Sequence, residues 1–337
     1  MLPSLEELQD CAHVVRLPLV TRFRGVDERE VLLLDGPNGW GEFAPFLEYA
    51  PAEASRWLTA AVEAGWSTWP LARRERVPVN AIVPAVAPDE AVRLVQASGG
   101  CRTAKVKVAE PGGTTADDVA RVRAVAAALV DRGRTDVRVR VDANGAWPVP
   151  DAVAALEALR TAAKDGGAVL EYAEQPCATL AEQAELRRRI DVHIATDEGL
   201  RKAGDPVHVD GLRAATDVLV VKVAPLGGVA RALEVAHAYD LPVVVSSALD
   251  SSVGLAAGTA LAAALETLDH ACGLGSGRLL GADVVADGDR VLPVDGHVAV
   301  RRPAPDGDLL VRLRADRDRE AWWRSRLADA YEIMAAS

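Results

Sequence analysis

The sequence has few lysines, although it is rich in basic residues. Only five of its 38 basic residues are lysines, at positions 105, 107, 164, 202 and 222, and the rest are arginines. Because a guanidinium does not lose its proton, a lysine retained inside an apolar segment indicates a need for an amine that can act as a base. The lysines of the apolar segments are therefore candidate catalytic groups.

Cysteine and histidine patterns typical of metal or redox sites are also missing. The four cysteines, at positions 11, 101, 177 and 272, are far apart and form no CxxC pair, and the six histidines follow no metal-ligand spacing. Zinc binding and dithiol chemistry are excluded on this pattern, and we expect reduced structural thiols.

Charge and hydropathy exclude further classes of partner. The 49 acidic residues outnumber the 38 basic ones, giving a net charge of −11 that repels nucleic acid and anionic membrane surfaces. No run approaches the ~20 apolar residues of a membrane span, and the first residues lack the pattern of a secretion signal. We expect a cytoplasmic protein that binds neither nucleic acid nor membranes. The sequence leaves the oligomeric state open.

From residue 79 onward, short β-rich runs alternate with alanine-rich helical segments such as 115–133 and 227–240. The eight candidate strands lie at 79–85, 103–109, 137–145, 170–176, 193–199, 218–225, 242–250 and 270–277. Steps of ~25 to 35 residues between strands are typical of a parallel (β/α)8 barrel. An open doubly wound sheet is the alternative, but it would need an early glycine-rich phosphate loop, which is missing. The sequence thus predicts an α/β protein with a barrel over residues 79–289.

The remaining residues follow a different pattern. Residues 1–78 contain two alternating strands joined by a charged turn, a glycine-rich connection and a helix over 51–66. After residue 280 the chain returns to short strands within 286–300 and ends in a helix over 318–335. We predict that 1–78 form an α+β capping domain, completed by about 290–337.

Acidic residues follow three neighbouring strands of the predicted barrel. Asp142 and Asn144 end the third strand, Glu174 the fourth, and Asp197 with Glu198 the fifth. In such barrels, functional groups lie at the carboxyl ends of the strands, so the three carboxylates are expected to converge on one hard cation, Mg²⁺. Taken singly, each acid has a simpler reading as a helix cap or a solvated charge.

The strand lysines are predicted to flank this metal site. Lys105 and Lys107 point to the same face of the second strand, and Lys222 lies on the sixth strand, across the barrel. Such lysines can also simply extend to water. A proton beside a carboxylate becomes removable when a divalent cation stabilises the enediolate and a neutral amine accepts the proton. We expect Lys105 to favour the neutral form of Lys107, the candidate base, through repulsion between two ammonium groups.

At these residues the sequence resembles the enolase superfamily, in its muconate lactonizing subgroup. The matching segments are KVK at 105–107, RVDANGAW at 140–147, EQP at 174–176, TDE at 196–198 and VKVAPLGG at 221–228. The resemblance implies Mg²⁺ held by Asp142, Glu174 and Asp197, with Mn²⁺ as a candidate substitute. It also implies Lys107 as base, Lys222 as the opposite cation and Lys105 as the group that tunes Lys107 and contacts the substrate carboxylate. Asn144, Glu198 and Arg140 would support the ligands.

The capping segments RFRGVDEREVLLL and WGEFAPFLEY resemble those of actinobacterial o-succinylbenzoate synthases. This implies dehydration of a cyclohexadiene carboxylate that carries a succinyl group, a step toward menaquinone. Ser246 and Gly273 would bind the succinyl tail, and the loop around Arg22 and Phe23 would close the mouth. Each could instead be an ordinary strand end, turn or solvated charge. An N-succinylamino acid racemase would share all these catalytic residues and stays an alternative, with a non-catalytic binding barrel as a remote one.

Overall fold

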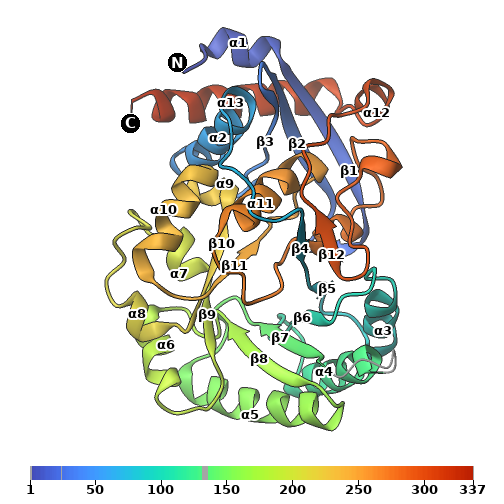
Figure 1. Ribbon diagram of the computed structural model, residues 1–337, viewed down its shortest axis with the longest axis vertical. Helices are drawn as coiled ribbons and strands as arrows, with labels where there is room; N and C mark the ends of the chain where they lie inside the picture. Colours follow the sequence, from blue (N-terminus) through green and yellow to red (C-terminus); the bar gives the residue numbers. More distant parts are fainter. Residues whose placement is uncertain (1, 24, 131–135, 337) are drawn as a thin grey trace.

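A curled parallel sheet forms the centre of the molecule. The computed structural model describes residues 2–23, 25–130 and 136–336, and seven strands of these residues make one sheet whose order follows the chain (Figure 1). The strands are β5 (Ala81–Val83), β6 (Thr103–Lys107), β7 (Arg138–Asp142), β8 (Val169–Glu174), β9 (Ile194–Thr196), β10 (Val218–Lys222) and β11 (Val243–Ser246). All six neighbouring pairs are parallel. All their carboxyl ends therefore face one side, where a site can form.

Residues 270–277 were expected to form the eighth strand. This prediction is wrong, although the segment lies where an eighth strand would lie. Cys272 bridges Val79 beside β5, and Gly273 bridges Ser246 at the end of β11, so this short segment joins the two edges of the sheet. A 3-10 helix, η1 (Gly275–Leu279), follows at once. A Cβ at Gly275 would lie 2.5 Å from the carbonyl oxygen of Asn80, so backbones meet here too closely for a regular strand. The barrel class predicted from the sequence is confirmed, with single bridges closing it.

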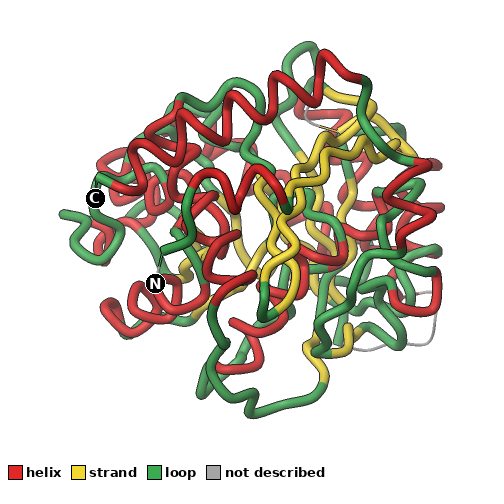
Figure 2. The backbone as a smooth tube through the Cα atoms, turned by 90° about the horizontal axis from the view of Figure 1, so that it is seen from above, coloured by secondary structure: helices red, strands yellow, loops and turns green. Residues whose placement is uncertain are grey.

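Helices cover the outside of the barrel, and Figure 2 shows the strands enclosed by them. Their apolar faces pack on the strands, whereas Tyr172, Ala195, Val218, Val220 and Val244 fill a small cluster of their own. The helices between β5 and residue 264 are α3 (Pro88–Gln96), α4 (Thr115–Val130), α5 (Val149–Asp165), α6 (Leu180–Arg187), α7 (Glu198–Arg201), α8 (Leu212–Ala215), α9 (Val223–Leu226), α10 (Val229–Tyr239) and α11 (Ser252–Ala264). The predicted helix over 115–133 corresponds to α4, and its positions 131–133 lie outside the described residues.

A three-stranded antiparallel sheet, β1 (Ala12–Phe23), β2 (Val26–Gly36) and β3 (Gly39–Phe43), lies at one end of the barrel (Figure 1). Helices α1 (Leu5–Asp10) and α2 (Pro51–Trp66) accompany it. The glycine-rich connection expected after the hairpin is in fact strand β3. Its glycine allows the sheet to approach α2, since a Cβ at Gly41 would lie 2.1 Å from the carbonyl oxygen of Ala61.

The last part of the chain returns to this end of the molecule. Helix α13 (Arg317–Ala335) packs on α2, and the rings of Trp323 and Phe43 meet edge to face at 5.9 Å. Between the barrel and α13 lie η2 (Asp287–Asp289), β12 (His297–Ala299) and α12 (Gly307–Arg312). Several short strands were expected over 286–300, but only β12 forms, paired with β4 (Arg76–Pro78). The division into a cap over 1–78 with about 290–337 and a barrel over 79–289 stays a proposal.

Candidate active site

Three buried carboxylates lie at the carboxyl ends of neighbouring strands. Asp142 is the last residue of β7 and pairs in register with Glu174, the last residue of β8, while Asp197 follows β9 directly. Their exposed fractions are 8%, 2% and 1%. The parallel register thus places all three acids at one edge of the barrel, as the strand pattern predicted.

Lys105 and Lys222 bind these carboxylates from both sides. The Nζ of Lys105 donates to Oδ2 of Asp142 at 2.8 Å and to Oε1 of Glu174 at 2.7 Å, and Nζ of Lys222 donates to Oδ2 of Asp197 at 2.6 Å. Burial would lower the pKa of Lys105, but Asp142 and Glu174 raise it well above its ordinary value. Lys105 is thus held as a cation.

Lys107 has a different environment from the other two lysines. Its Nζ donates to the carbonyl oxygen of Asp142 at 3.3 Å and lies 3.9 Å from a carboxylate oxygen of Glu110, whose side chain is half-exposed. Of the three lysines of this site, Lys107 therefore makes the weakest contact with a carboxylate. It lines the same cavity as Lys105 and Lys222.

The three carboxylates suit a hard divalent cation chemically. Among residues 2–23, 25–130 and 136–336, no three acidic, histidine or cysteine side chains already stand arranged around an ion position. Yet burial, together with the charges of Asp142 and Asp197, raises the pKa of Glu174 to about 7 against the opposing effect of Lys105. Carboxylates close enough to repel one another in this way form a set of oxygen donors that a divalent cation would neutralise. The donor set fits Mg²⁺.

A network of side chains orients the acids. The side-chain amide of Asn144 donates to Oε1 of Glu198 at 3.1 Å, and its backbone N–H donates to Asp142 at 3.1 Å. Arg201, which the sequence analysis missed, donates to Asp197 at 3.0 Å and to Glu198 at 2.8 Å. Its spacing of three and four residues from the two acids, on one helical turn, was a usable signal.

Gln175 is a second residue that the sequence analysis missed. Its side-chain oxygen accepts hydrogen bonds from the backbone N–H groups of Asp197 and Gly199, both at 3.2 Å. Gln175 also adopts a left-handed backbone conformation, with φ of 41°. The residue after Glu174 therefore connects the ends of β8 and β9 and fixes their spacing.

Arg140 lies inside the barrel and is fully buried. Its guanidinium donates to Glu171 at 2.5 Å, to the side chain of Asn80 at 3.0 Å and to the carbonyl oxygen of Ala271 at 2.7 Å. The side chain thus connects β7 and β8 with the segments where the barrel closes. Any support for the acids is indirect, through the position of their strands.

A cavity of about 960 Å³ is lined both by residues of the site and by residues at the end of the cap. Of the predicted residues, Arg22, Phe23, Lys105, Lys107, Asp142, Asn144, Glu198, Lys222 and Ser246 line it. Gly273 lies behind Ser246, where a Cβ would meet the Oγ of Ser246 at 2.4 Å. A volume of this size accommodates a small organic acid, and its walls come from both the barrel and the cap.

Sequence and structure comparisons define the class of the protein. Residues 14–65 match the family model described as Enolase N-terminal domain-like, and residues 87–307 match the one described as Enolase C-terminal domain-like. The crystal structure of muconate lactonizing enzyme from Pseudomonas fluorescens, complexed with muconolactone, superposes with a TM-score of 0.72 at 19% identity, covering 90% of this chain and 98% of that one. The fold is therefore that of the enolase-like barrels.

Relatives of much higher identity narrow the class. The o-succinylbenzoate synthase of Mycobacterium tuberculosis (strain ATCC 25618 / H37Rv) is 52% identical over all of this chain and 98% of its own length. The o-succinylbenzoate synthase of Mycobacterium leprae (strain TN) is 53% identical over 99% of this chain and 95% of its own. The chain belongs to the enolase superfamily and, within it, to the o-succinylbenzoate synthase family.

Proposed function

We propose that this protein is an o-succinylbenzoate synthase. It dehydrates 2-succinyl-6-hydroxy-2,4-cyclohexadiene-1-carboxylate to o-succinylbenzoate, a hydro-lyase reaction of menaquinone biosynthesis. Identity of 52% with synthases across the whole chain supports this. The observation that carries the chemistry is the contrast among three lysines in one cavity, where Lys107 alone is bound mainly to a carbonyl oxygen.

Lys107 performs the proton transfer in this proposal. Its neutral amine removes the proton on the ring carbon that bears the carboxylate, and the electron pair left behind expels hydroxide from the neighbouring carbon. The ring becomes aromatic, and the ammonium of Lys107 returns the proton to the departing hydroxide, releasing water. One base on one face of the ring is enough.

Lys222 and Lys105 supply positive charge without exchanging protons. Lys222 ends β10, across the acids from β6, where its ammonium can face the second negative charge that develops on the substrate carboxylate. Lys105, held as a cation by two acids, lies two residues from Lys107 on the same strand and stands beside the substrate carboxylate.

We assign Asp142, Glu174 and Asp197 as the residues that hold Mg²⁺, with Mn²⁺ as a substitute. The bound cation would act as a Lewis acid toward the substrate carboxylate. Asn144, Glu198 and Arg140 serve to keep the carboxylates in place. Divalent-metal dependence fits the superfamily.

The succinyl tail is assigned to the far wall of the cavity. Ser246 and Gly273 shape that wall where β11 meets the closing segment, and Arg22 with Phe23, the last residues of β1, cover it. A small-molecule carboxylate is thus the expected partner. No helix among the described residues is long and apolar enough to cross a bilayer. The cytoplasmic location stays a prediction.

The test is an assay of the purified protein with Mg²⁺ against two substrates. We expect rapid dehydration of the cyclohexadiene carboxylate and slow or negligible racemisation of N-succinylamino acids. Racemisation that is much faster than dehydration would replace the proposal with the racemase alternative.

A further inference from the structure

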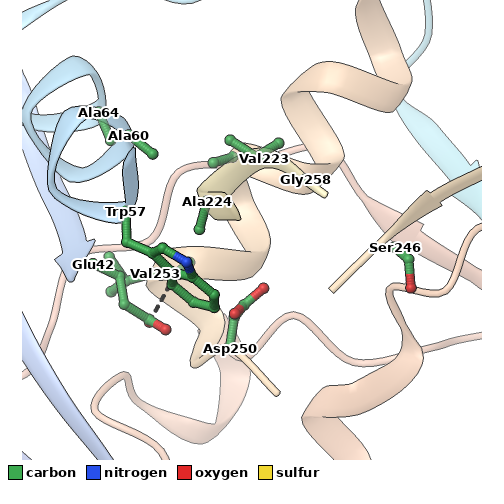
Figure 3. Close-up of a pocket in the computed structure, with 12 residues that line it drawn as sticks. Glu42, Trp57, Ala60, Ala64, Val223, Ala224, Ser246, Asp250, Val253 and Gly258 are labelled. Carbon is green, nitrogen blue, oxygen red and sulfur yellow. Dashed lines mark hydrogen bonds between the residues drawn. The ribbon is translucent and has the colours of Figure 1, made fainter. Parts of the chain in front are cut away.

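A thin wall separates the active-site cavity from a second, much smaller cavity. This wall segment, residues 246–250, follows β11. Ser247, Ala248 and Leu249 line the large cavity, Asp250 lines a cavity of about 30 Å³, and Ser246 lines both. Figure 3 shows the smaller cavity, with Trp57 between Glu42 and Asp250. The wall therefore borders open space on both sides, although Ala248 and Leu249 are themselves buried.

The wall includes a backbone conformation that other contacts must maintain. Leu249 has φ of +64°, in the left-handed region that side chains with a Cβ rarely adopt. Such a residue persists where its surroundings hold it, and it is often found at functional sites. Asp250 contributes locally by accepting a hydrogen bond from the backbone N–H of Ala248 at 3.2 Å.

A buried arginine of the cap holds the wall from outside the barrel. Arg29 lies on β2 and is only 4% exposed. Its Nε donates to the carbonyl oxygen of Leu249 at 3.4 Å, and its Nη2 donates to Ala44 and, at 3.5 Å, to Ala248. The guanidinium carbon also lies 4.6 Å from the ring centre of Phe46, another residue of the active-site cavity. One side chain therefore connects the wall segment with the cap.

A glutamate of the next cap strand holds the other end of the wall. Oε2 of Glu42, on β3, accepts hydrogen bonds from the backbone N–H groups of Ser251 and Gly254, both at 3.1 Å, and from the hydroxyl of Ser251. These groups begin helix α11, which follows the wall directly. Gly254 lets the carboxylate approach, since a Cβ there would lie 2.8 Å from the Cδ of Glu42.

We propose that Arg29 and Glu42 are positioning residues that clamp the wall segment and so shape the part of the cavity that receives the substrate's tail. They act through Ser246 to Leu249. A guanidinium suits position 29 because two of its nitrogens, Nε and Nη2, donate to carbonyl oxygens at separate points, whereas an ammonium places all its donors on one nitrogen. The identity of the tail rests on the proposed function, whereas the clamp itself does not.

The experiment compares Arg29→Met and Arg29→Lys with a matched control, Arg324→Met. Arg324 also lies in the cap region and donates to two backbone carbonyl oxygens, of Gln9 and Ala12, away from the cavity. Amide hydrogen exchange of residues 244–254 is measured for each protein, together with kcat and KM for dehydration of the cyclohexadiene carboxylate.

For Arg29→Met we expect exchange of the wall amides to rise about tenfold or more, as expected for losing hydrogen bonds from a charged group. KM should rise by about the same factor with kcat nearly unchanged, since the lysines are untouched. Arg29→Lys should show smaller rises in exchange and in KM. If Arg29→Met does not fold, Arg29→Lys serves as the test in its place. Arg324→Met should show neither change.

Unchanged exchange in 244–254 for the Arg29 variants would overturn the clamp. So would a fall in kcat with KM unaltered, because that is the signature of a smaller folded fraction. If the wild type does not dehydrate the substrate, the proposed function fails, and hydrogen exchange still decides whether Arg29 holds the wall.

Discussion

The ammonium nitrogen of Lys222 lies 2.6 Å from Oδ2 of Asp197, and Arg201 binds the other oxygen of this carboxylate at 3.0 Å. Burial would raise the pKa of Asp197, but Lys222 and Arg201 lower it to about 2. Lys222 is therefore part of a charged network in the barrel wall. Lys107 has no such carboxylate at hydrogen-bond distance among the contacts described, so the two lysines are unequal. This inequality favours a one-base reaction over a two-base one.

Replacing Lys107 should eliminate dehydration. Lys107→Ala removes the base, and Lys107→Arg should be equally inactive because a guanidinium cannot accept the proton. The measurement is steady-state product formation, with circular dichroism as the control for folding. Substantial activity in a folded Lys107→Arg protein would rule out Lys107 as the base.

Replacing Lys222 should give a graded result. Lys222→Ala should slow dehydration on the order of 10³-fold or more, since it removes the charge opposite the developing enediolate. Lys222→Arg keeps a positive charge and should retain a small residual rate. Incubating the Lys107 and Lys222 variants with L- and D-N-succinylamino acids in D₂O adds a second readout. Suppose that the Lys107 variant exchanged the α-proton of one enantiomer, the Lys222 variant that of the other, and wild-type dehydration were negligible. Both lysines would then be bases, and the enzyme would be a racemase.

Magnesium binding should depend on the three strand-end acids. We expect Mg²⁺ to raise the thermal midpoint of the wild type, because a ligand that binds only the folded state stabilises it. Glu174→Gln should abolish this rise while leaving the metal-free fold nearly intact, because the pKa of Glu174 near 7 means that a neutral side chain is already tolerated. Asp142→Asn and Asp197→Asn should also lose the response to Mg²⁺. Glu185→Gln, which changes an acid on helix α6, is the control and should respond like the wild type. An unaltered Mg²⁺ response in all three variants would refute the assignment.

Acid should weaken the barrel through Glu171. Burial would raise the pKa of this carboxyl, but hydrogen bonds from His270 and Arg140 and their charges lower it to about 2. A carboxylate whose folded pKa lies below its unfolded value stabilises the fold above the unfolded pKa, and this contribution is lost as pH falls from about 4.5 to about 2. The loss should amount to about 3 kcal/mol. Urea unfolding of the wild type and of Glu171→Gln across this range measures it. The variant should be less stable at neutral pH and less sensitive to acid, whereas replacement of the exposed Glu266 should leave the wild-type dependence unchanged.

The sequence predicted the site's strand-borne residues because their positions follow from local pattern. Asp142, Glu174 and Asp197 each end or follow a short apolar run, and parallel strands carry such residues to one edge whatever the loops do. Lys105 and Lys107 were found in the same way, from alternation along one strand. Residue type and spacing were sufficient there, because the barrel repeats one simple unit.

Residues whose contacts are distant in the sequence could not be predicted in this way. Arg29 contacts carbonyl oxygens about 220 residues further along the chain, and no local pattern marks it among 33 arginines. The prediction of an eighth strand was wrong for a related reason. Whether residues 270–277 form a strand depends on how closely two sheet edges approach, and that distance is set by the whole barrel.

Elements far apart in the sequence pack together at the cap end of the molecule, with α13 on α2 and Arg319 bound to Glu30 of β2. During synthesis, β1, β2 and α2 leave the ribosome long before α13. Their apolar surface therefore stays uncovered until residues 317–335 have been synthesised. The strands that carry Lys105, Lys107 and Lys222 also precede α13 in the chain, so these lysines are synthesised before the helix that covers the cap core. A chain released early would therefore present an exposed cap core to cellular proteases and chaperones before it could act on any substrate.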